Sequence, residues 1–402
     1  MIEKPTEPFE WSPAGVGEYY VAGLTGYTGL DYHSVAQLSK RPAVRSQMGG
    51  RGLYKASMAI LPNGDIIASP VDMLHPSMAS PYPTGTPNEF FGEEPQLRNW
   101  PVRLHISRDN GASWEPMEHT PLLGKENSLT CLDDGSLLFT GESVDAVCRS
   151  EDGGHTWNMT PMETPRESYQ SVSIVRGPIF QSDGTISIMR CVGTHEGWSK
   201  TDAPANCRAW LRHSSDCGRS WSELEPVEVW DDSFAMFVES DFLSLPDGRL
   251  LATSRFEYDH PIEGTSPPHP PGSVPNDHAA GHIVLMESAD GGRTWTEPRD
   301  FLNYSEVHAH LALLSDGRIL CTHLNYHLPF GTGAVVSNDM GKTWDFDHPI
   351  QLSISNGPSN GWPTTRQLAD GTLLTIYALS PYYQEPEESG RSVVHTVRWE
   401  LP

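Results

Sequence analysis

The stretch Ser107-Arg-Asp109-Asn-Gly111-Ala-Ser113-Trp114 is the first of five copies of one motif, Ser-x-Asp-x-Gly-x-Ser/Thr-Trp. The other copies span residues 150–157, 214–221, 288–295 and 337–344. Each copy follows a short apolar stretch, which predicts a strand, a tight turn and a second strand. In such a turn the Asp accepts backbone N–H groups, the Gly takes a positive φ, and the Trp packs beneath.

A second repeat alternates with the first. It consists of an apolar strand, an Asp-Gly or Asn-Gly turn and another apolar strand, which is the pattern of a β-hairpin. The six turns are Asn63-Gly64, Asp134-Gly135, Asp183-Gly184, Asp247-Gly248, Asp316-Gly317 and Asp370-Gly371. Five hairpins are followed by the Asp-containing motif, and the sixth is followed by one strand at 392–399.

Six copies of this two-part unit predict an all-β chain folded as a six-bladed β-propeller, with four antiparallel strands in each blade. The Asp-containing turns would join the outer strands, and residues 1–402 would form one domain. We expect a strand near residues 19–24 to complete the sixth blade, because closing the ring removes exposed sheet edges. A β-sandwich, the alternative all-β fold, does not explain the repetition.

The composition narrows the function classes. The 402 residues include 36 Gly and 34 Pro, which disfavour a helical bundle. The sequence has 27 Lys plus Arg and 52 Asp plus Glu, which give a formal net charge of −25. So acidic a chain is expected to bind neither nucleic acid nor an anionic membrane. No apolar run reaches the roughly 20 residues of a membrane span.

The first 21 residues lack a secretory signal, so we expect a cytoplasmic protein, with a mature secreted form as the alternative. The six cysteines have no metal-ligand spacing, and we expect them to be buried free thiols. No cofactor is expected.

The Asp boxes (BNR repeats) on six predicted blades resemble the sialidase (neuraminidase) superfamily, over nearly the whole chain, and the chain is similar to a divergent exo-α-sialidase. The family carries a Glu followed some residues later by an Arg that binds a substrate carboxylate. Glu239 and Arg255 in ESDFLSLPDGRLLATSR match these two positions. The resemblance further implies that Lys55 replaces an Arg of the first blade and that Asp72 is the acid/base residue.

Two positions depart from the family. Trp362 stands where the family has its Tyr nucleophile, and the fifth blade contains His308 and His310 where the family has an Arg. A tryptophan offers no nucleophilic oxygen, so the resemblance implies a mechanism different from that of Tyr-nucleophile sialidases. Tyr377, Tyr382 and Tyr383 are the tyrosines nearest in sequence.

The central site of a propeller can be located by counting from the hairpin turns, because the inner strand ends opposite the turn surround the axis. Nine residues before the turn Gly stand Lys55, Glu126, Glu239, His308 and Trp362. Two residues later, on the same strand face, stand Ser57, Ser128, Asp241, His310 and Thr364. Seven or eight residues after the Gly stand Asp72, Glu142, Arg255 and Asn325.

Blade three interrupts this count, because Arg176-Gly177-Pro178 breaks its strand, and Glu167, Tyr169 and Gln170 are its nearest equivalents. Insertions at 72–100, 192–207 and 257–280 all follow the second strand of a hairpin and are expected to rise from the same face. Charged, imidazole and aromatic side chains that converge from several blades indicate a binding pocket.

Three functions fit such a pocket. The first is a glycoside hydrolase acting on a terminal acidic sugar, with Glu239, Asp72, His308 and Asp241 as catalytic residues. Its substrate-binding residues would be Lys55, Arg255, Trp362, Glu126, His310 and Tyr169, with Trp362 stacking on a sugar ring.

The second is a polysaccharide lyase that cleaves next to a uronate, with His308 or His310 as base and Tyr169 or Tyr326 as acid. The third is a glycan-binding propeller without catalysis. The pair His308 and His310 could also hold a metal with Glu239 or Asp241, but two hydrogen-bonded histidines are the preferred interpretation, and no metal is expected.

Overall fold

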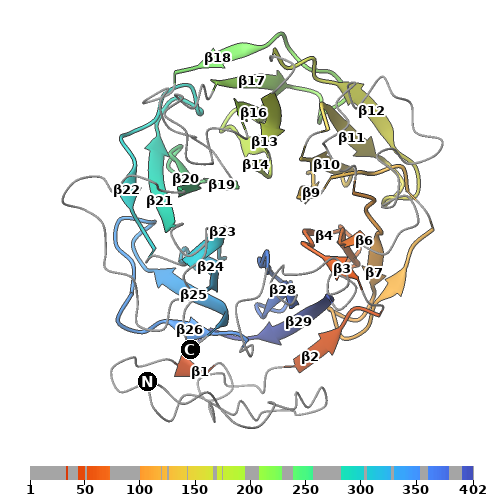
Figure 1. The fold of residues 1–402 in the computed structure, drawn as a ribbon, viewed down its shortest axis with the longest axis vertical. Coiled ribbons are helices and arrows are strands. Elements are labelled where there is room, and N and C mark those ends of the chain that lie inside the picture. The colour runs from red at the N-terminus through yellow and green to blue at the C-terminus, as the bar shows by residue number, and fades with distance from the viewer. Residues whose placement is uncertain are drawn as a thin grey trace.

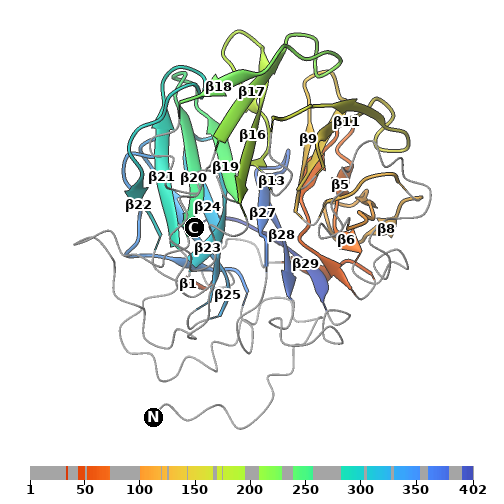
Figure 2. The same cartoon turned by 45° about the horizontal axis from the view of Figure 1, so that its top comes forward.

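The chain forms a ring of six β-sheet blades around a central axis, as Figure 1 shows and as Figure 2 shows in a tilted view. The computed structural model describes residues 33–34, 44–49, 52–72, 100–118, 120–124, 126–142, 144–165, 170–173, 175–194, 208–228, 239–256, 282–302, 306–326, 330–353, 361–379 and 392–401. Over these residues the regular structure is β-strand, and no helix is long and apolar enough to cross a bilayer. The predicted all-β propeller of six four-stranded blades is confirmed.

The strands of each blade follow one another outward from the axis. In blades one to three they are β4 (Met58–Ile60), β5 (Ile66–Ala68), β7 (His105–Ser107) and β8 (Glu115–Pro116); β9 (Asn127–Cys131), β10 (Leu137–Gly141), β11 (Ala146–Ser150) and β12 (Asn158–Pro161); and β13 (Gln170–Ser173), β16 (Ile186–Thr194), β17 (Arg208–Ser214) and β18 (Glu225–Val227). In blades four to six they are β19 (Ser240–Ser244), β20 (Leu250–Phe256), β21 (His282–Ser288) and β22 (Arg299–Asp300); β23 (Glu306–Leu313), β24 (Ile319–Asn325), β25 (Gly331–Ser337) and β26 (Ile350–Gln351); and β27 (Thr364–Gln367), β28 (Leu373–Leu379), β29 (Val393–Trp399) and β2 (Val44–Gln47).

Additional short strands accompany four of the blades. β3 (Leu53–Tyr54) pairs with β6 (Val71–Asp72) beyond the first hairpin, and β15 (Ile179–Phe180) pairs with β16. β14 (Val175–Arg176) leaves blade three and runs parallel to β19 of blade four, while β1 (His33–Ser34) runs parallel to β26. The inner strands of neighbouring blades pack together around the ring, from β4 and β9 through β19, β23 and β27 back to β4.

The ring is closed by a strand from the N-terminal part of the chain. β2 pairs antiparallel with β29, the last strand of the chain, and so completes blade six at the bottom of Figure 1. The closing strand is therefore Val44–Gln47 and not residues 19–24, which lie outside the described residues. The apolar pattern of a sequence does not locate this outer strand, because the strand reads Val-Arg-Ser-Gln and is only partly buried.

Both predicted turns form as expected. The glycines of the six hairpin turns have φ between 80° and 90°, which is a left-handed conformation that glycine adopts without strain. In the first Asp-containing turn, Ser113 N and Ser113 Oγ donate to the Asp109 carboxylate at 2.8 and 2.6 Å, and Gly111 N donates to Ser107 Oγ at 2.9 Å. The other four copies repeat these contacts. These turns join the two outer strands of their blades, far from the axis.

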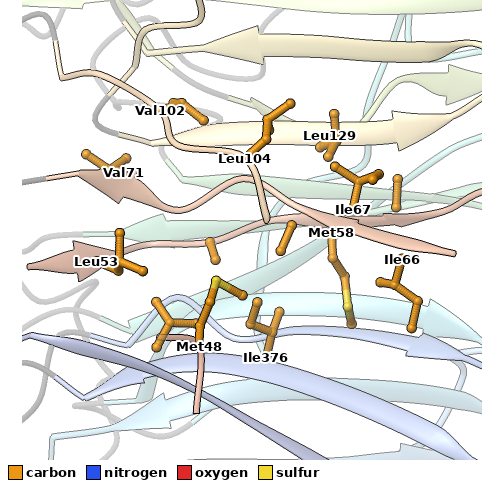
Figure 3. Packing of buried hydrophobic residues seen from close by; sticks show 14 of the residues in the cluster. Met48, Leu53, Met58, Ile66, Ile67, Val71, Val102, Leu104, Leu129 and Ile376 are labelled. Atoms are coloured by element: carbon orange, nitrogen blue, oxygen red, sulfur yellow. The ribbon is translucent and has the colours of Figure 1, made fainter. Parts of the chain in front are cut away.

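The hydrophobic core lies between neighbouring blades. Figure 3 shows its largest cluster, in which Met58 and Ile66 of blade one meet Leu129 of blade two and Ile376 of blade six. Such face-to-face packing buries the apolar side of every sheet and leaves polar side chains for the axis. The five described cysteines are free thiols, and Cys148, Cys191 and Cys321 are buried.

Candidate active site

The inner strands turn sharply where they reach the mouth of the ring. Lys55, Glu239, His308 and Trp362, four of the residues nine positions before a turn Gly, have φ of 39°, 46°, 56° and 76°. For residues other than glycine this left-handed conformation costs about 1–2 kcal/mol each. Its recurrence at one level of four blades is characteristic of a functional site, where strain is retained because it aims side chains.

A β-bulge produces the turn in at least two blades. In blade five, Val307 pairs with Leu324 and His310 pairs with Thr322. The inner strand therefore advances three residues while its partner advances two, which leaves one extra residue on the inner strand. Blade one has the same offset, because Tyr54 pairs with Val71 and Met58 pairs with Ala68. The extra residue in each case directs Lys55 or His308 away from the ladder, as bulges beside active sites do.

Seven buried side chains from all six blades form a connected group, which we call the axial cluster. It comprises Lys55, Glu126, Arg176, Glu239, Arg255, His308 and Trp362, each at most 6% exposed. Six of these residues were predicted from the sequence, and the structure brings them together.

Glu239 is the centre of the axial cluster. Its Oε2 lies 2.6 Å from Arg255 Nη1 and 2.8 Å from His308 Nδ1, and its Oε1 lies 3.8 Å from Lys55 Nζ. Burial alone would raise the pKa of this carboxyl, but Arg255 outweighs burial with the help of the neighbouring groups and holds the pKa well below 4.5. Glu239 is therefore ionised at neutral pH, and Lys55 also pairs with Glu126.

His308 is a neutral imidazole at physiological pH. Burial lowers its pKa to about 3, although Glu239 acts in the opposite direction. Because a carboxylate only accepts hydrogen bonds, the tautomer that fits the 2.8 Å separation between Nδ1 and Glu239 Oε2 carries the ring proton on Nδ1. Nε2 is then a proton acceptor, and within the described structure no protein group bonds to it.

The Trp362 ring packs against two cations and the His308 ring of the axial cluster. Arg176 Cζ lies 3.6 Å from the centroid of its ring, Lys55 Nζ lies 4.8 Å from it, and the His308 ring centroid lies 5.3 Å away. Trp362 is 0% exposed. That it stacks on a sugar ring stays a prediction; in this structure the Lys55 and Arg176 cations lie against the Trp362 ring.

A second level of residues, two positions further along the inner strands, connects the blades. Each of its members bonds to the backbone of the next blade's inner strand or of the segment beside it, and we call this group the inter-blade ring. Its contacts are Leu129 N to Ser57 Oγ at 3.1 Å, Gly177 N to Ser128 Oγ at 2.6 Å, Leu311 N to Asp241 Oδ2 at 2.6 Å, Thr365 N to His310 Nδ1 at 3.4 Å, and Thr364 Oγ1 to Ala56 O at 3.2 Å.

Asp241 and His310 belong to the inter-blade ring, and their predicted roles in catalysis and substrate binding stay predictions. Asp241 accepts from Leu311 N of blade five, whereas His310 Nδ1 lies 3.4 Å from Thr365 N of blade six and His310 Nε2 lies 2.7 Å from Arg366 Nη1. Burial raises the pKa of Asp241 to about 6 and lowers that of His310 well below 6.5. Sequence spacing could not separate the two levels, because both lie on the same face of the strand.

Asp72 and Tyr169 are the remaining predicted site residues. Asp72 ends β6 opposite Leu53, and its Oδ2 lies 3.7 Å from Arg103 Nη1. Its assignment as acid/base remains a prediction. Tyr169 lies outside the described residues, as do most of the three insertions and the candidates Tyr382 and Tyr383. Tyr377 does not replace the missing nucleophile, because its hydroxyl accepts from Arg45 Nη1 at 3.0 Å in the outer part of blade six.

Arg176 was missed by the sequence analysis. It belongs to the segment that breaks blade three, and β14 carries it toward the axis beside β19. The count of nine residues before Gly184 falls on Val175, the other residue of this short strand, so the spacing pointed to the correct segment. The described part of the chain contains no group of three or more His, Cys, Asp or Glu side chains able to hold a metal ion.

Comparisons with known proteins support the architecture. No protein-family model matches the sequence, and no curated protein matches it. A protein of unknown function from Dyadobacter fermentans has a TM-score of 0.62 at 19% identity, covering 89% of this chain and 98% of that chain.

Two enzymes show the same similarity at lower identity. The GH93 α-L-arabinofuranosidase of Fusarium graminearum has a TM-score of 0.55 at 12% identity, covering 89% of this chain and 97% of that chain. The intramolecular trans-sialidase of Ruminococcus gnavus has a TM-score of 0.53 at 10% identity, covering 87% and 94%. The chain thus has the six-bladed propeller fold of sialidases and GH93 arabinofuranosidases.

Proposed function

We propose that this protein is a glycoside hydrolase that removes a terminal acidic sugar bound at the axial cluster. The observation that carries the proposal is the contact between ionised Glu239 and neutral His308, with Arg255 and Lys55 beside them. Glycosidases among the proteins of similar fold support the reaction class. The cations support an acidic sugar.

The pair Glu239 and His308 can activate water. His308 Nε2 would take a proton from water, whose oxygen forms a bond to the anomeric carbon while the glycosidic bond breaks. Glu239 would stabilise the imidazolium formed, as the buried Asp does in a Ser-His-Asp triad. The leaving oxygen takes a proton from a carboxylic acid, for which Asp72 is the candidate. Direct attack by water inverts the anomeric configuration.

Sugar release tests this proposal. We expect the protein to liberate the fluorophore from a 4-methylumbelliferyl glycoside of N-acetylneuraminic acid or of glucuronic acid. His308→Gln should lower kcat by about 100-fold or more, the usual contribution of a positioned general base. His348→Gln, which changes an exposed histidine paired with Asp345, is the matched control and should retain the full rate. Equal rates for His308→Gln and wild type would exclude this mechanism.

A β-elimination next to a uronate is a second candidate, because the same neutral imidazole is the base that a lyase needs. The Tyr326 ring lies 6.4 Å from the His308 ring, centroid to centroid, and would be the acid. Ultraviolet absorbance of an unsaturated uronate product would identify this reaction. Binding of an acidic glycan without either product would instead indicate a binding protein.

A further inference from the structure

Arg176 extends across the axis. Its backbone pairs with Asp241 between blades three and four, whereas its side chain reaches blade six, where Nη1 donates to Pro363 O at 2.6 Å. Blades three and six lie on opposite sides of the ring in Figure 1. The side chain is 4% exposed and its guanidinium stacks on Trp362.

One edge of this guanidinium has no partner. Nε and Nη2 are both buried, and in the described structure neither donates to a protein acceptor. No carboxylate of the described residues lies within ion-pair distance of Arg176, although Asp241, Glu239 and Glu126 act on it electrostatically. Leaving charged donors buried and unpaired is costly, and such donors in a native protein call for an explanation.

The other cations of the axial cluster are already paired. Arg255 Nη1 binds Glu239 at 2.6 Å, and Lys55 pairs with Glu126 and also approaches Glu239. A ligand carboxylate that used either of them would compete with an internal carboxylate. Arg176 has no such competitor.

Nε and Nη2 form the side edge of a guanidinium, where two parallel N–H bonds point in one direction. This edge matches the two oxygens of a carboxylate, which it binds in a bidentate manner. Trp362 fixes the plane of the guanidinium and the bond to Pro363 O fixes its rotation, so the edge is preorganised.

We propose that Arg176 is the residue that binds the carboxylate of the acidic sugar, in place of the Arg255 and Lys55 predicted from the sequence. This inference rests on the proposed function, because it assumes an acidic sugar at the axial cluster. In this arrangement Trp362 supports Arg176, while Arg255 and Lys55 keep Glu239 ionised.

The test compares acids with their methyl esters, which lose the negative charge and keep the ring. N-acetylneuraminic acid, glucuronic acid and the two esters are titrated into the wild-type protein and into Arg176→Gln and Arg176→Lys by calorimetry. We expect the wild type to bind one acid about 10- to 100-fold more tightly than its ester, the range of a charge-assisted hydrogen bond. Arg176→Gln should abolish that preference, and Arg176→Lys should lose most of it with the bidentate geometry.

Arg366→Gln is the matched control, because Arg366 is also an axial arginine but binds His310. It should retain the preference for the acid. If Arg176→Gln folds and still prefers the acid, the inference is wrong while the hydrolase proposal stands. If the wild type shows no preference but releases a neutral sugar, the acidic substrate is wrong and hydrolysis stands.

A crystal structure of the wild type with the preferred acid decides the matter even if the variants do not fold. We expect the carboxylate oxygens at about 2.7–2.9 Å from Arg176 Nε and Nη2. A carboxylate bound by Arg255 or Lys55 would overturn the inference.

Discussion

Replacing Glu239 by Gln should reveal how strongly the axial cluster depends on one negative charge. The carboxylate lies 2.6 Å from Arg255 Nη1, and the two side chains are 7% and 4% exposed. The amide keeps the shape of the side chain but leaves Arg255 buried without its counter-charge. Breaking a buried pair in this way costs about 3–5 kcal/mol of stability. Urea unfolding followed by tryptophan fluorescence measures this loss.

A double-mutant cycle attributes the loss to the pair. Arg255→Met removes the partner charge, so Glu239→Gln should cost roughly 1–3 kcal/mol less in that background than in the wild type. If the cost is the same in both backgrounds, or below about 1 kcal/mol in the wild type, the two groups are not coupled as the structure shows.

The same variant has a pH dependence of known sign. The folded pKa of Glu239 is lowered, so its contribution is complete above the unfolded value of about 4.3 and is lost as the pH falls below it. The stability difference between wild type and Glu239→Gln should therefore shrink between pH 6 and pH 3. A difference that stays constant over this range would show that the carboxylate is not held ionised.

Three other outcomes are expected. Since His308 stays neutral down to about pH 3, kcat should persist at pH 4.5, where a histidine of ordinary pKa 6.5 would already have cost most of the rate; a pH–rate profile measures this. Asp241→Asn keeps an acceptor for Leu311 N but removes a buried carboxyl whose pKa is raised to about 6, so stability should rise by roughly 1–3 kcal/mol at pH 8 and not at pH 4; a loss at pH 8 would contradict the assignment. Because His308 has a φ of 56°, the His308→Gly variant should be more stable than the His308→Ala variant by roughly 0.5–1 kcal/mol in urea unfolding. The control is Ala309→Gly, at the adjacent strand position outside the left-handed region, which should be destabilising.

The fold could be predicted almost completely because short local sequence motifs specify its turns. An Asp-Gly dipeptide or an Asp that accepts from Ser113 N acts within a few residues, so the sequence alone specifies its geometry. Ring closure depends instead on a contact between distant segments, β2 and β29. Nothing local distinguishes Val44–Gln47 from the preceding residues as the pairing partner, and the prediction of its position was wrong.

The site could be predicted at the level of position but not of role. Counting from the turns found Lys55, Glu239 and His308 because the inner hairpins of these blades keep the same spacing to the turn Gly. It could not show that Asp241 and His310 contact a neighbouring blade, because that depends on how the blades pack against one another. Arg176 escaped for a related reason, since it lies where the repeat is broken.

The contrast between the two levels is itself an argument for function. The inter-blade ring shows how the propeller treats buried polar groups where only stability is at stake: Ser57, Ser128 and Asp241 each accept from a backbone N–H of the next strand or segment. The axial cluster, one step closer to the mouth, combines left-handed backbone at His308 with charged donors of Arg176 that no described protein group satisfies. A propeller built only for stability would avoid both costs by repeating the lower level. The two costs occur together at this level, which is typical of a site that binds a ligand.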